Sequence, residues 1–542
     1  MKTLWSWAFL ITVVGLAGTS RGEKRFNVLL IVSDDLRTDL NSYGGPAITP
    51  ALDKFASSTG TMQFDRAYVQ QAICCPSRSS FLTGRRPDTT QVWDLKTQFR
   101  LTPGALKWLT LPQFFRKKGY MTAGMGKIFH PVLYKNQSDD VAGGSWTAPY
   151  FHGKGGEDTK HPLSETNCGV SSTVEDDAKY TDGMIADHAV ETLRNATRGI
   201  SAPPFFIAVG FHRPHLPWIV PRKYFEKYPE DSAIPLADYA HPPKHYNATG
   251  AQKWSWDPQS GPRHCEPLYS LTYPSVILPE YGLVDNATAR HFRRSYWAAV
   301  SQMDRNVGLV LDELDALGVS DNTVVAFLGD HGWQLGDLGE FGKKTNFERA
   351  TRAPLIIRDP IAHKKGVTSG KSMELVEFVD IMPTLIDLAL GSETVPPLCP
   401  LNSTNVDSCT EGQSLRPIME ASSKGATKRS AAFMQYAYCM HDERVWHDAC
   451  MGKTDPQVMG YAIRTKRWRY VEWVKFDKKS VKPIWNELLG TELYDHTEED
   501  IVENVAESVN VVSDPKNKKI VEQLSKRLHA GWRRARSSYT LV

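Results

Sequence analysis

Four apolar runs with the composition of β-strands end abruptly in polar side chains, and they constrain the fold more than any other feature of the chain. The runs are FNVLLIVS (26–33), YMTAGMG (120–126), FFIAVGF (205–211) and TVVAFLG (323–329). Continuous apolar runs of this kind are typical of strands that are buried on both faces of a mostly parallel sheet. The polar residues that follow the runs are Asp34, Asp35, Lys127, His130, His212, His215, Asp330 and His331.

The segments that connect the runs have helical patterns. Apolar residues recur at helical spacing from 289 to 317, and Gly318 offers a C-cap. The segment MELVEFVDIMPTLIDLAL (373–390) is predicted as a second helix. Helices that alternate with buried strands indicate a layered α/β domain, in which a site lies beyond the carboxyl ends of the strands. One site there would gather the polar residues that follow the runs.

The pattern changes after about residue 430. The segments YAIRT (461–465) and RYVEWV (469–474) are predicted as paired antiparallel strands. An amphipathic helix follows, with Ile520, Val521, Leu524, Leu528 and Trp532 on its apolar face. We therefore expect a main domain over 23–432 and a smaller α+β subdomain with an antiparallel sheet over 433–542.

The chain begins with MKTLWSWAFLITVVGLAGTSRG (1–22), in which a basic residue precedes a short apolar run and small residues. This pattern predicts a secretory signal peptide, because the apolar run is short for the alternative, a membrane anchor of ~20 residues. No later stretch is long and apolar enough to cross a bilayer, so we expect no membrane span. Five sequons fit the secretory route, at Asn136, Asn195, Asn247, Asn286 and Asn402.

Length and charge limit the classes of function. A chain of 542 residues exceeds one ordinary core, and 41% hydrophobic against 23% charged residues is the composition of a folded protein. The net charge of +3 is close to neutral for this size, which argues against a general nucleic-acid or membrane binder. Any selection of an anionic substrate must then come from a local cluster of cations.

Eight cysteines in an oxidising compartment form disulfides by default. The candidate local bridges are Cys399–Cys409 and Cys439–Cys450. Cys168 and Cys265 are left over, and whether they pair with each other stays open. The adjacent Cys74 and Cys75 have no obvious partner, and they cannot easily bridge each other because the ring would be strained.

Acidic and imidazole groups follow two of the strands. Asp34, Asp35, Asp330 and His331 offer three carboxylates and one ring nitrogen, a set that suits one divalent cation. Mostly oxygen donors favour Ca²⁺ or Mg²⁺ over Zn²⁺. The alternative for Asp34 and Asp35 is a helix cap or a turn. That alternative weakens because a second strand brings an Asp-His pair to the same edge.

Several cations follow strands or lie in nearby loops, and they are Arg78, Lys127, His130, His215 and Lys343. A single lysine or histidine in such a place is usually a solvated loop residue. Five that converge around one metal would form a pocket for a compact oxyanion, with arginine as a bidentate donor. The sequence therefore predicts a site for sulfate or phosphate.

The stretch Cys74-Cys75-Pro76-Ser77-Arg78, followed by LTGR (82–85), resembles the signature of the type I sulfatases. In that family the first cysteine of C-x-P-S-R is oxidised to formylglycine by a formylglycine-generating enzyme. Only Cys74 has proline at +2 and arginine at +4, so the resemblance implies that Cys74 is the modified residue. Cys75 then fills the variable position, and we expect it to be a buried free thiol or a packing residue.

Further segments carry the resemblance over most of the chain: DDLR (34–37), CCPSRSSFLTGRRPDTT (74–90), GKIFHP (126–131), PFFIAVGFHRPHLP (204–217), DHGWQLGDLGEFGKKTNF (330–347) and MGYAIRT (459–465). It implies an alkaline-phosphatase-like layered fold with a large mostly parallel or mixed sheet between helices. The stretches GRRPDTT (84–90) and DHGWQLGDLGE (330–340) are similar to the branch that removes the 2-O-sulfate of iduronate in heparan and dermatan sulfate. The enzymes of that branch are lysosomal, and secretion is the alternative.

The resemblance also implies roles for single residues. The ligands of one Ca²⁺ would be Asp34, Asp35, the formylglycine oxygen at position 74, Asp330 and His331. Lys127 and Lys343 would bind the sulfate oxygens, and Arg78 would steady the formylglycine and the metal shell. The histidines at 130 and 215 would handle protons: His130 as the base for elimination, His215 as a donor to the sulfate or the leaving sugar oxygen. Trp333 would line the sugar pocket, although an aromatic residue after a strand is more often core.

Three other readings remain. Another glycosaminoglycan or aryl sulfatase would share every catalytic residue and differ only in its loops. A phosphodiesterase or phosphatase of the same superfamily would normally have threonine or serine as its nucleophile and ligands for a second metal. A carbohydrate-binding relative without activity would be expected to have lost Cys74, Arg78 or an aspartate ligand, and all of these are present.

Overall fold

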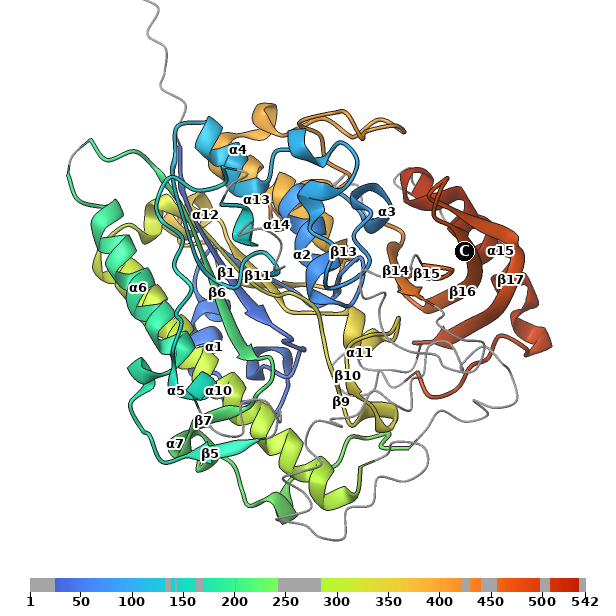
Figure 1. The fold of residues 1–542 in the computed structure, drawn as a ribbon, viewed down its shortest axis with the longest axis horizontal. Helices are drawn as coiled ribbons and strands as arrows, with labels where there is room; N and C mark the ends of the chain where they lie inside the picture. The colour runs from blue at the N-terminus through green and yellow to red at the C-terminus, as the bar shows by residue number, and fades with distance from the viewer. Residues whose placement is uncertain are drawn as a thin grey trace, which may run out of the picture.

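The computed structural model describes residues 25–131, 138–141, 144–160, 169–199, 201–241, 284–420, 429–439, 456–497 and 507–535 (Figure 1). Some predictions fall outside these residues, namely the leader at 1–22, the sequons at Asn136 and Asn247, and Cys168, Cys265 and Cys450. Among the described residues, no helix combines the length and the apolar character that a bilayer crossing requires.

A seven-stranded mixed sheet lies at the centre of the main domain, in the order β12-β2-β11-β8-β1-β6-β4. Its strands are β1 (Asn27–Asp34), β2 (Thr61–Phe64), β4 (Met121–Gly126), β6 (Phe205–Pro214), β8 (Thr323–Gly329), β11 (Leu355–Arg358) and β12 (Gly370–Ser372). The four apolar runs form the parallel neighbours β8, β1, β6 and β4, as expected. Only β11 runs antiparallel to its neighbours.

Helices cover both faces of this sheet (Figure 1). Leu29 and Ile31 of β1 enter one core with the long helices α6 (Thr181–Ala196) and α10 (Asn286–Ala316). The alternate residues Val28, Leu30 and Val32 enter a second core with α2 (Cys74–Thr83), α4 (Leu111–Lys117) and α13 (Ile381–Leu390). Because successive strand side chains point to opposite faces, a strand covered on both sides must be apolar throughout. The layered fold predicted from the sequence is confirmed.

The remaining elements are short and lie around the two cores. The helices are α1 (Pro50–Ser57), α3 (Pro87–Thr90), α5 (Glu157–Lys160), α7 (Arg222–Phe225), α11 (Glu348–Thr351), α12 (Pro360–Lys364) and α14 (Arg416–Met419). The strands are β3 (Ala67–Tyr68), β5 (Val170–Ser172), β7 (Ile219–Pro221), β9 (Gln334–Leu335), β10 (Phe341–Gly342) and β13 (Val376–Glu377).

A separate four-stranded antiparallel sheet follows, in the order β14-β15-β16-β17. Its strands are β14 (Ala432–Tyr438), β15 (Val458–Arg464), β16 (Trp468–Asp477) and β17 (Lys482–Asp495). The helix α15 (Lys518–Ala535) packs Leu524 and Leu528 against Phe433 and Ile463 of this sheet. Both the predicted strand pair and the predicted amphipathic helix are confirmed.

The helix predicted over 373–390 begins later than expected, at Ile381. Residues 376–377 pair with β3 instead, and a 3₁₀ turn over 378–380 leads into α13. Pro383 explains the difference, because a proline ring clashes with the carbonyl group four residues earlier and is tolerated only in the first turn of a helix.

A buried ionic cluster joins α11 to the C-terminal sheet. Glu348 accepts hydrogen bonds from Arg464 Nε at 3.0 Å, from Arg469 Nη2 and from the Tyr68 hydroxyl at 2.7 Å. Arg469 also pairs with Glu507 at 2.6 Å. Burial by itself would raise the pKa of Glu348, but Arg464 and Arg469 outweigh it and hold the pKa well below its usual value. Glu348 is therefore ionised, and its negative charge compensates the positive charges of the buried Arg464 and Arg469.

Cysteines and sequons are placed as follows. Cys399 and Cys409 form the predicted disulfide, and Cys439 is also disulfide-bonded. Cys75 is a buried free thiol. The sequon asparagines at Asn195, Asn286 and Asn402 are exposed.

The cluster around Glu348 yields a stability prediction. Glu348→Gln removes the anion and leaves buried arginine charge uncompensated, so the free energy of unfolding should fall by about 3–5 kcal/mol in a urea titration. Arg467→Ala is the control, because its pair with Asp495 is half exposed and should contribute about 0–1 kcal/mol. Equal effects of the two substitutions would contradict the assignment.

Candidate active site

The acidic residues gather where parallel strands end. Asp34 is the last residue of β1, and Asp330 and His331 directly follow β8. Since β1 and β8 are parallel, with Ser33 opposite Gly329, their carboxyl ends lie at one edge of the sheet. The Asp35 backbone N–H donates to Asp330 Oδ1 at 2.9 Å, which ties the two strand ends together.

Asp35 has an unusual backbone conformation, with a φ of 60°. Left-handed conformations cost a non-glycine residue free energy unless the surroundings hold them. Here Tyr296 of α10 donates its hydroxyl to the Asp35 carbonyl at 2.7 Å and accepts from the Arg37 N–H at 2.9 Å. In the sequence, Tyr296 is one of the apolar residues that recur at helical spacing from 289 to 317, and that pattern does not predict this contact.

Cys74 is the first residue of α2, and its side chain is buried at the centre of the charged groups. Its Sγ lies 3.0 Å from Lys343 Nζ and 3.3 Å from His331 Nε2. Asp35 Oδ1 and Lys127 Nζ are each 3.8 Å away. Burial and the neighbouring Asp34 raise the pKa of the Cys74 thiol well above its usual value, even though both lysines lower it.

Arg78 is fully buried one helical turn after Cys74. Its Nε donates to Asp330 Oδ2 at 2.9 Å and its Nη2 to Asp34 Oδ1 at 3.2 Å. Its Nη1 donates to the carbonyl groups of Lys127 and, at 3.0 Å, Ile128. Because every nitrogen of the guanidinium is engaged, Arg78 holds two carboxylates and the end of β4 in fixed positions.

Two buried lysines face the aspartates. Lys127 pairs with Asp34, and Lys343 pairs with Asp35. Burial by itself would raise the pKa of Asp34, but Lys127, His215 and Arg78 outweigh it and hold the pKa well below its usual value. Burial by itself would lower the pKa of Lys343, but the charge of Asp35 raises it. The lysines are therefore charged and the aspartates ionised.

The two predicted histidines lie at the same site and are neutral near pH 7. His215 Nε2 is 3.8 Å from Asp35 Oδ2, and burial lowers its pKa to about 4. Burial, followed by the charge of Lys127, lowers the pKa of His130 to about 2. The buried Nδ1 of His130 has no hydrogen-bond partner among the described residues.

Trp333 borders the lysine side of the site. Its ring lies 5.4 Å from Lys343 Nζ, an approach that favours a cation–π interaction. The indole is mostly buried, and its Nε1 has no hydrogen-bond partner in the part of the chain that is described.

The donor set suits a divalent cation. Two overlapping groups have ligand atoms within 4.8 Å of one another, one with Asp34, Cys74, Asp330 and His331 and one with Asp34, Asp35, Cys74 and His215. Asp35 Oδ2 is buried without a hydrogen-bond partner among the described residues, as an oxygen held for a metal would be. Three carboxylates at one point fit a hard cation.

A third group with metal-ligand spacing consists of Glu348, His496 and Glu507. Its carboxylates already pair with Arg464 and Arg469. The two arginines already supply the positive charge that a metal would bring. We therefore assign the group of Glu348, His496 and Glu507 a structural role.

Comparisons with known proteins show the family of this chain. The family model described as Sulfatase matches residues 26–392. The chain is 34% identical to iduronate 2-sulfatase of Mus musculus over 90% of this chain and 92% of the relative. It is 35% identical to iduronate 2-sulfatase of Homo sapiens over 86% of this chain and 88% of the relative.

Solved structures with a similar fold are known. One is a complex with the substrate D-glucosamine-2-N,6-O-disulfate, which matches with a TM-score of 0.64 and 21% identity over 95% of this chain and 99% of that chain. At that identity the likeness concerns the fold alone. The family match and the two relatives above go further: this chain belongs to the sulfatase family and is a sulfuric ester hydrolase.

Proposed function

We propose that the protein removes the 2-O-sulfate from terminal iduronate in heparan and dermatan sulfate, with a formylglycine at position 74 as nucleophile. The observation that carries the proposal is the position of Cys74, buried between two lysines, a histidine and an aspartate at the ends of β1 and β8. The substrate is inferred from the two iduronate 2-sulfatases, which match at 34% and 35% identity over most of the chain.

The residue at the centre of the site is a cysteine whose surroundings disfavour the thiolate form. Conversion of this cysteine to formylglycine explains its presence there. The pKa of the Cys74 thiol is raised by burial, so the unmodified side chain is a poor nucleophile near neutral pH. A hydrated aldehyde has two hydroxyl groups on one carbon. One attacks the sulfur while the sugar alcohol leaves, and loss of the proton from the other reforms the aldehyde and releases sulfate.

Each surrounding residue has a proposed part in this sequence. Lys127 and Lys343 bind the sulfate oxygens, because both are charged and lie next to the nucleophile. His215 donates a hydrogen bond to the sulfate or a proton to the leaving sugar oxygen. His130 is the base for elimination, a part for which its ring must be neutral, as burial keeps it here. Trp333 lines the sugar pocket.

Asp34, Asp35, Asp330, His331 and the oxygen at position 74 would hold one Ca²⁺. When bound, the cation would neutralise the charge of the sulfate group and acidify a hydroxyl of the nucleophile. Lys127 and Lys343 would then be free to turn from the carboxylates toward the sulfate. Arg78 has no such freedom, because its guanidinium is fully engaged, and we assign it to positioning.

The other enzymatic reading is another glycosaminoglycan or aryl sulfatase, with the same residues around Cys74. A phosphodiesterase of the same superfamily is less well supported, because the nucleophile position holds cysteine in the C-x-P-S-R frame. We place the protein in the secretory pathway and then in lysosomes, with secretion as the alternative. The exposed sequon asparagines Asn195, Asn286 and Asn402 support that route.

The modification can be tested by mass spectrometry of the tryptic peptide 67–78. Residue 74 should be about 18 Da lighter than cysteine, while Cys75 remains a thiol that can be alkylated. Cys75→Ala should keep the mass loss, and Cys74→Ala should abolish both the mass loss and sulfate release. Conversion at position 75, or none, would refute the assignment.

The substrate can be tested by sulfate release at acid pH from a disaccharide that ends in 2-sulfo-iduronate, beside a simple aryl sulfate. We expect the disaccharide to be cleaved with the higher kcat/KM. If only the aryl sulfate is cleaved, the assignment of the nucleophile would stand, and the proposed substrate would change to that of another sulfatase class.

The cation can be tested by removal. After dialysis against a chelator, the rate of sulfate release should fall roughly tenfold or more, because no cation then neutralises the sulfate group or acidifies the nucleophile. Added Ca²⁺ should restore the rate. Restoration by Mg²⁺ but not by Ca²⁺ would show that the ion is assigned wrongly, and full activity after chelation would refute the metal.

A further inference from the structure

The strand β6 contains a bulge at its carboxyl end, next to the catalytic edge. Ser33 of the neighbouring strand β1 lies opposite Phe211. The next residue of β1, Asp34, lies opposite Pro214, so the two residues of β6 between these positions are extra and leave the ladder. A bulge bends its strand and takes backbone groups out of the ladder, and other groups must then satisfy them.

The bulge decides which residue of β6 lies beside Asp35. A regular register would continue with Arg213 there. The two extra residues bring His215 to this place instead, and its Nε2 lies 3.8 Å from Asp35 Oδ2. The other ring nitrogen of His215, Nδ1, is 2.6 Å from the carbonyl oxygen of Leu216. Because a carbonyl group only accepts, Nδ1 is the donor and Nε2 is the nitrogen that faces the site.

Asp182, near the start of α6, accepts hydrogen bonds from both extra residues. Its Oδ1 accepts from the His212 backbone N–H and its Oδ2 from the Arg213 backbone N–H, each at 2.8 Å. Asp182 is almost completely buried. Burial by itself would raise its pKa, but the hydrogen bond from the His212 side chain and the charge of Arg213 outweigh it and lower the pKa. An ionised carboxylate therefore satisfies the N–H groups that the bulge takes out of the ladder.

The side chain of Arg213 holds the turn that follows the bulge. Its Nη2 pairs with Asp158 of α5 at 2.8 Å, and its Nη1 donates to the carbonyl oxygen of His215 at 3.3 Å. Asp158 also accepts from the N–H and the hydroxyl group of Thr181, at 3.0 and 2.9 Å. The start of α6 is therefore connected to the bulge and, through the Arg213–Asp158 pair, to the backbone of His215.

The carbonyl groups of the bulge find partners within the strand pair and the turn. Ser33 Oγ donates to the Arg213 carbonyl at 2.7 Å, and the His215 N–H donates to the His212 carbonyl at 2.8 Å. The two N–H groups depend instead on one side chain, that of Asp182.

We propose that Asp182 and Arg213 are positioning residues for His215, which hold the bulge so that Nε2 of His215 faces the sulfate group. The proposal rests on the part that His215 has in the proposed function. Neither positioning residue needs to contact the substrate. A displacement of about 1 Å in an acting group can cost about a hundredfold in rate, so loss of either residue should slow sulfate release only while His215 is present.

A double-mutant cycle on the full chain separates positioning from general damage to the fold. Asp182→Asn should lower kcat/KM roughly tenfold or more, because an amide cannot accept from both backbone N–H groups. In a His215→Ala background the same substitution should change kcat/KM by less than about twofold. Arg213→Lys, which cannot hold Asp158 and the His215 carbonyl together, should show the same dependence, and it decides the test if Asp182→Asn does not fold.

Asp304→Asn is the matched control. Asp304 is as deeply buried as Asp182, and its two oxygens also accept from consecutive backbone N–H groups, those of Ala51 and Leu52, at 3.0 and 2.8 Å. The segment that Asp304 holds is the first turn of α1, which contains no residue of the site. This substitution should therefore leave kcat/KM within about twofold.

Equal losses in the two backgrounds, or an equal loss from Asp304→Asn, would overturn the proposal, because a purely structural residue acts whether or not His215 is present. An unchanged rate in His215→Ala would refute both the part assigned to His215 and its positioning. Rates are measured on the iduronate disaccharide or, if that is not cleaved, on the aryl sulfate, so a wrong substrate does not affect the cycle.

Cleavage of neither substrate would refute the proposed function without deciding the role of Asp182. In that case, or if His215→Ala is too slow to measure, the same cycle is read on the binding of inorganic sulfate by calorimetry. Asp182→Asn should then weaken binding only while His215 is present, and equal weakening in both backgrounds would overturn the proposal.

Discussion

The arrangement of the catalytic edge depends on the burial of three carboxylates at one point. Asp34, Asp35 and Asp330 are almost completely inaccessible to solvent, and ionised groups in such a place require compensating charge or hydrogen bonds. Arg78, Lys127 and Lys343 supply that charge. The same three cations also surround the position of the nucleophile, so the forces that allow the carboxylates to be buried also create a binding site for an oxyanion.

Much of this could be predicted from the sequence because it follows from local patterns. Apolar runs that end in polar residues locate both the parallel strands and the edge where Asp34 and Asp330 meet. The frame of C-x-P-S-R distinguishes Cys74 from Cys75. Lys343 was named only as a cation in a loop near the strand ends, and its role as a sulfate ligand came from the family resemblance; in the structure it follows the short strand β10 (Phe341–Gly342).

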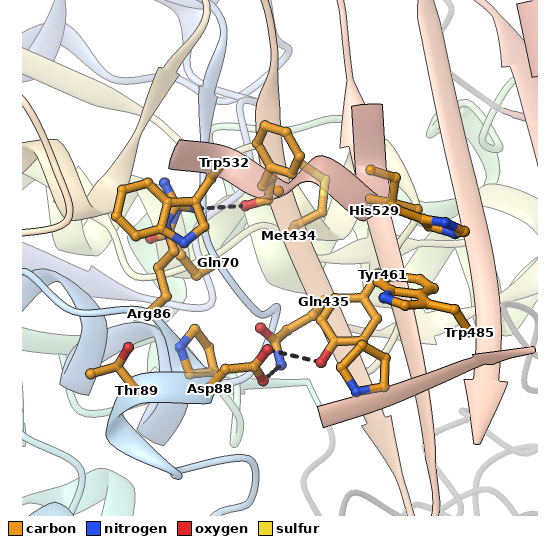
Figure 2. A pocket seen from close by; sticks show the side chains of 16 residues that line it. Gln70, Arg86, Asp88, Thr89, Met434, Gln435, Tyr461, Trp485, His529 and Trp532 are labelled. Carbon is orange, nitrogen blue, oxygen red and sulfur yellow. Dashed lines mark hydrogen bonds between the residues drawn. The ribbon is translucent and has the colours of Figure 1, made fainter. Parts of the chain in front are cut away.

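What the sequence did not reveal depends on contacts between distant segments. The hydroxyl of Tyr296 holds the strained Asp35, yet its position in the helix indicates only a core residue. The late start of α13 depends on Pro383, and the spacing of apolar residues alone does not reveal the effect of a proline. A cavity between the main domain and the C-terminal sheet combines Arg86 with Trp485 and Trp532, which lie far apart in the sequence (Figure 2).

The burial of Cys74 also bears on the order of events in the life of the chain. Only 1% of this residue is accessible in the folded protein, and its helix is packed into the second core of the main domain. A modifying enzyme could not reach the sulfur without opening that structure. The proposed conversion must therefore come before folding. A chain that folds before it is modified would have the same fold but would keep a cysteine at position 74 and so lack its nucleophile.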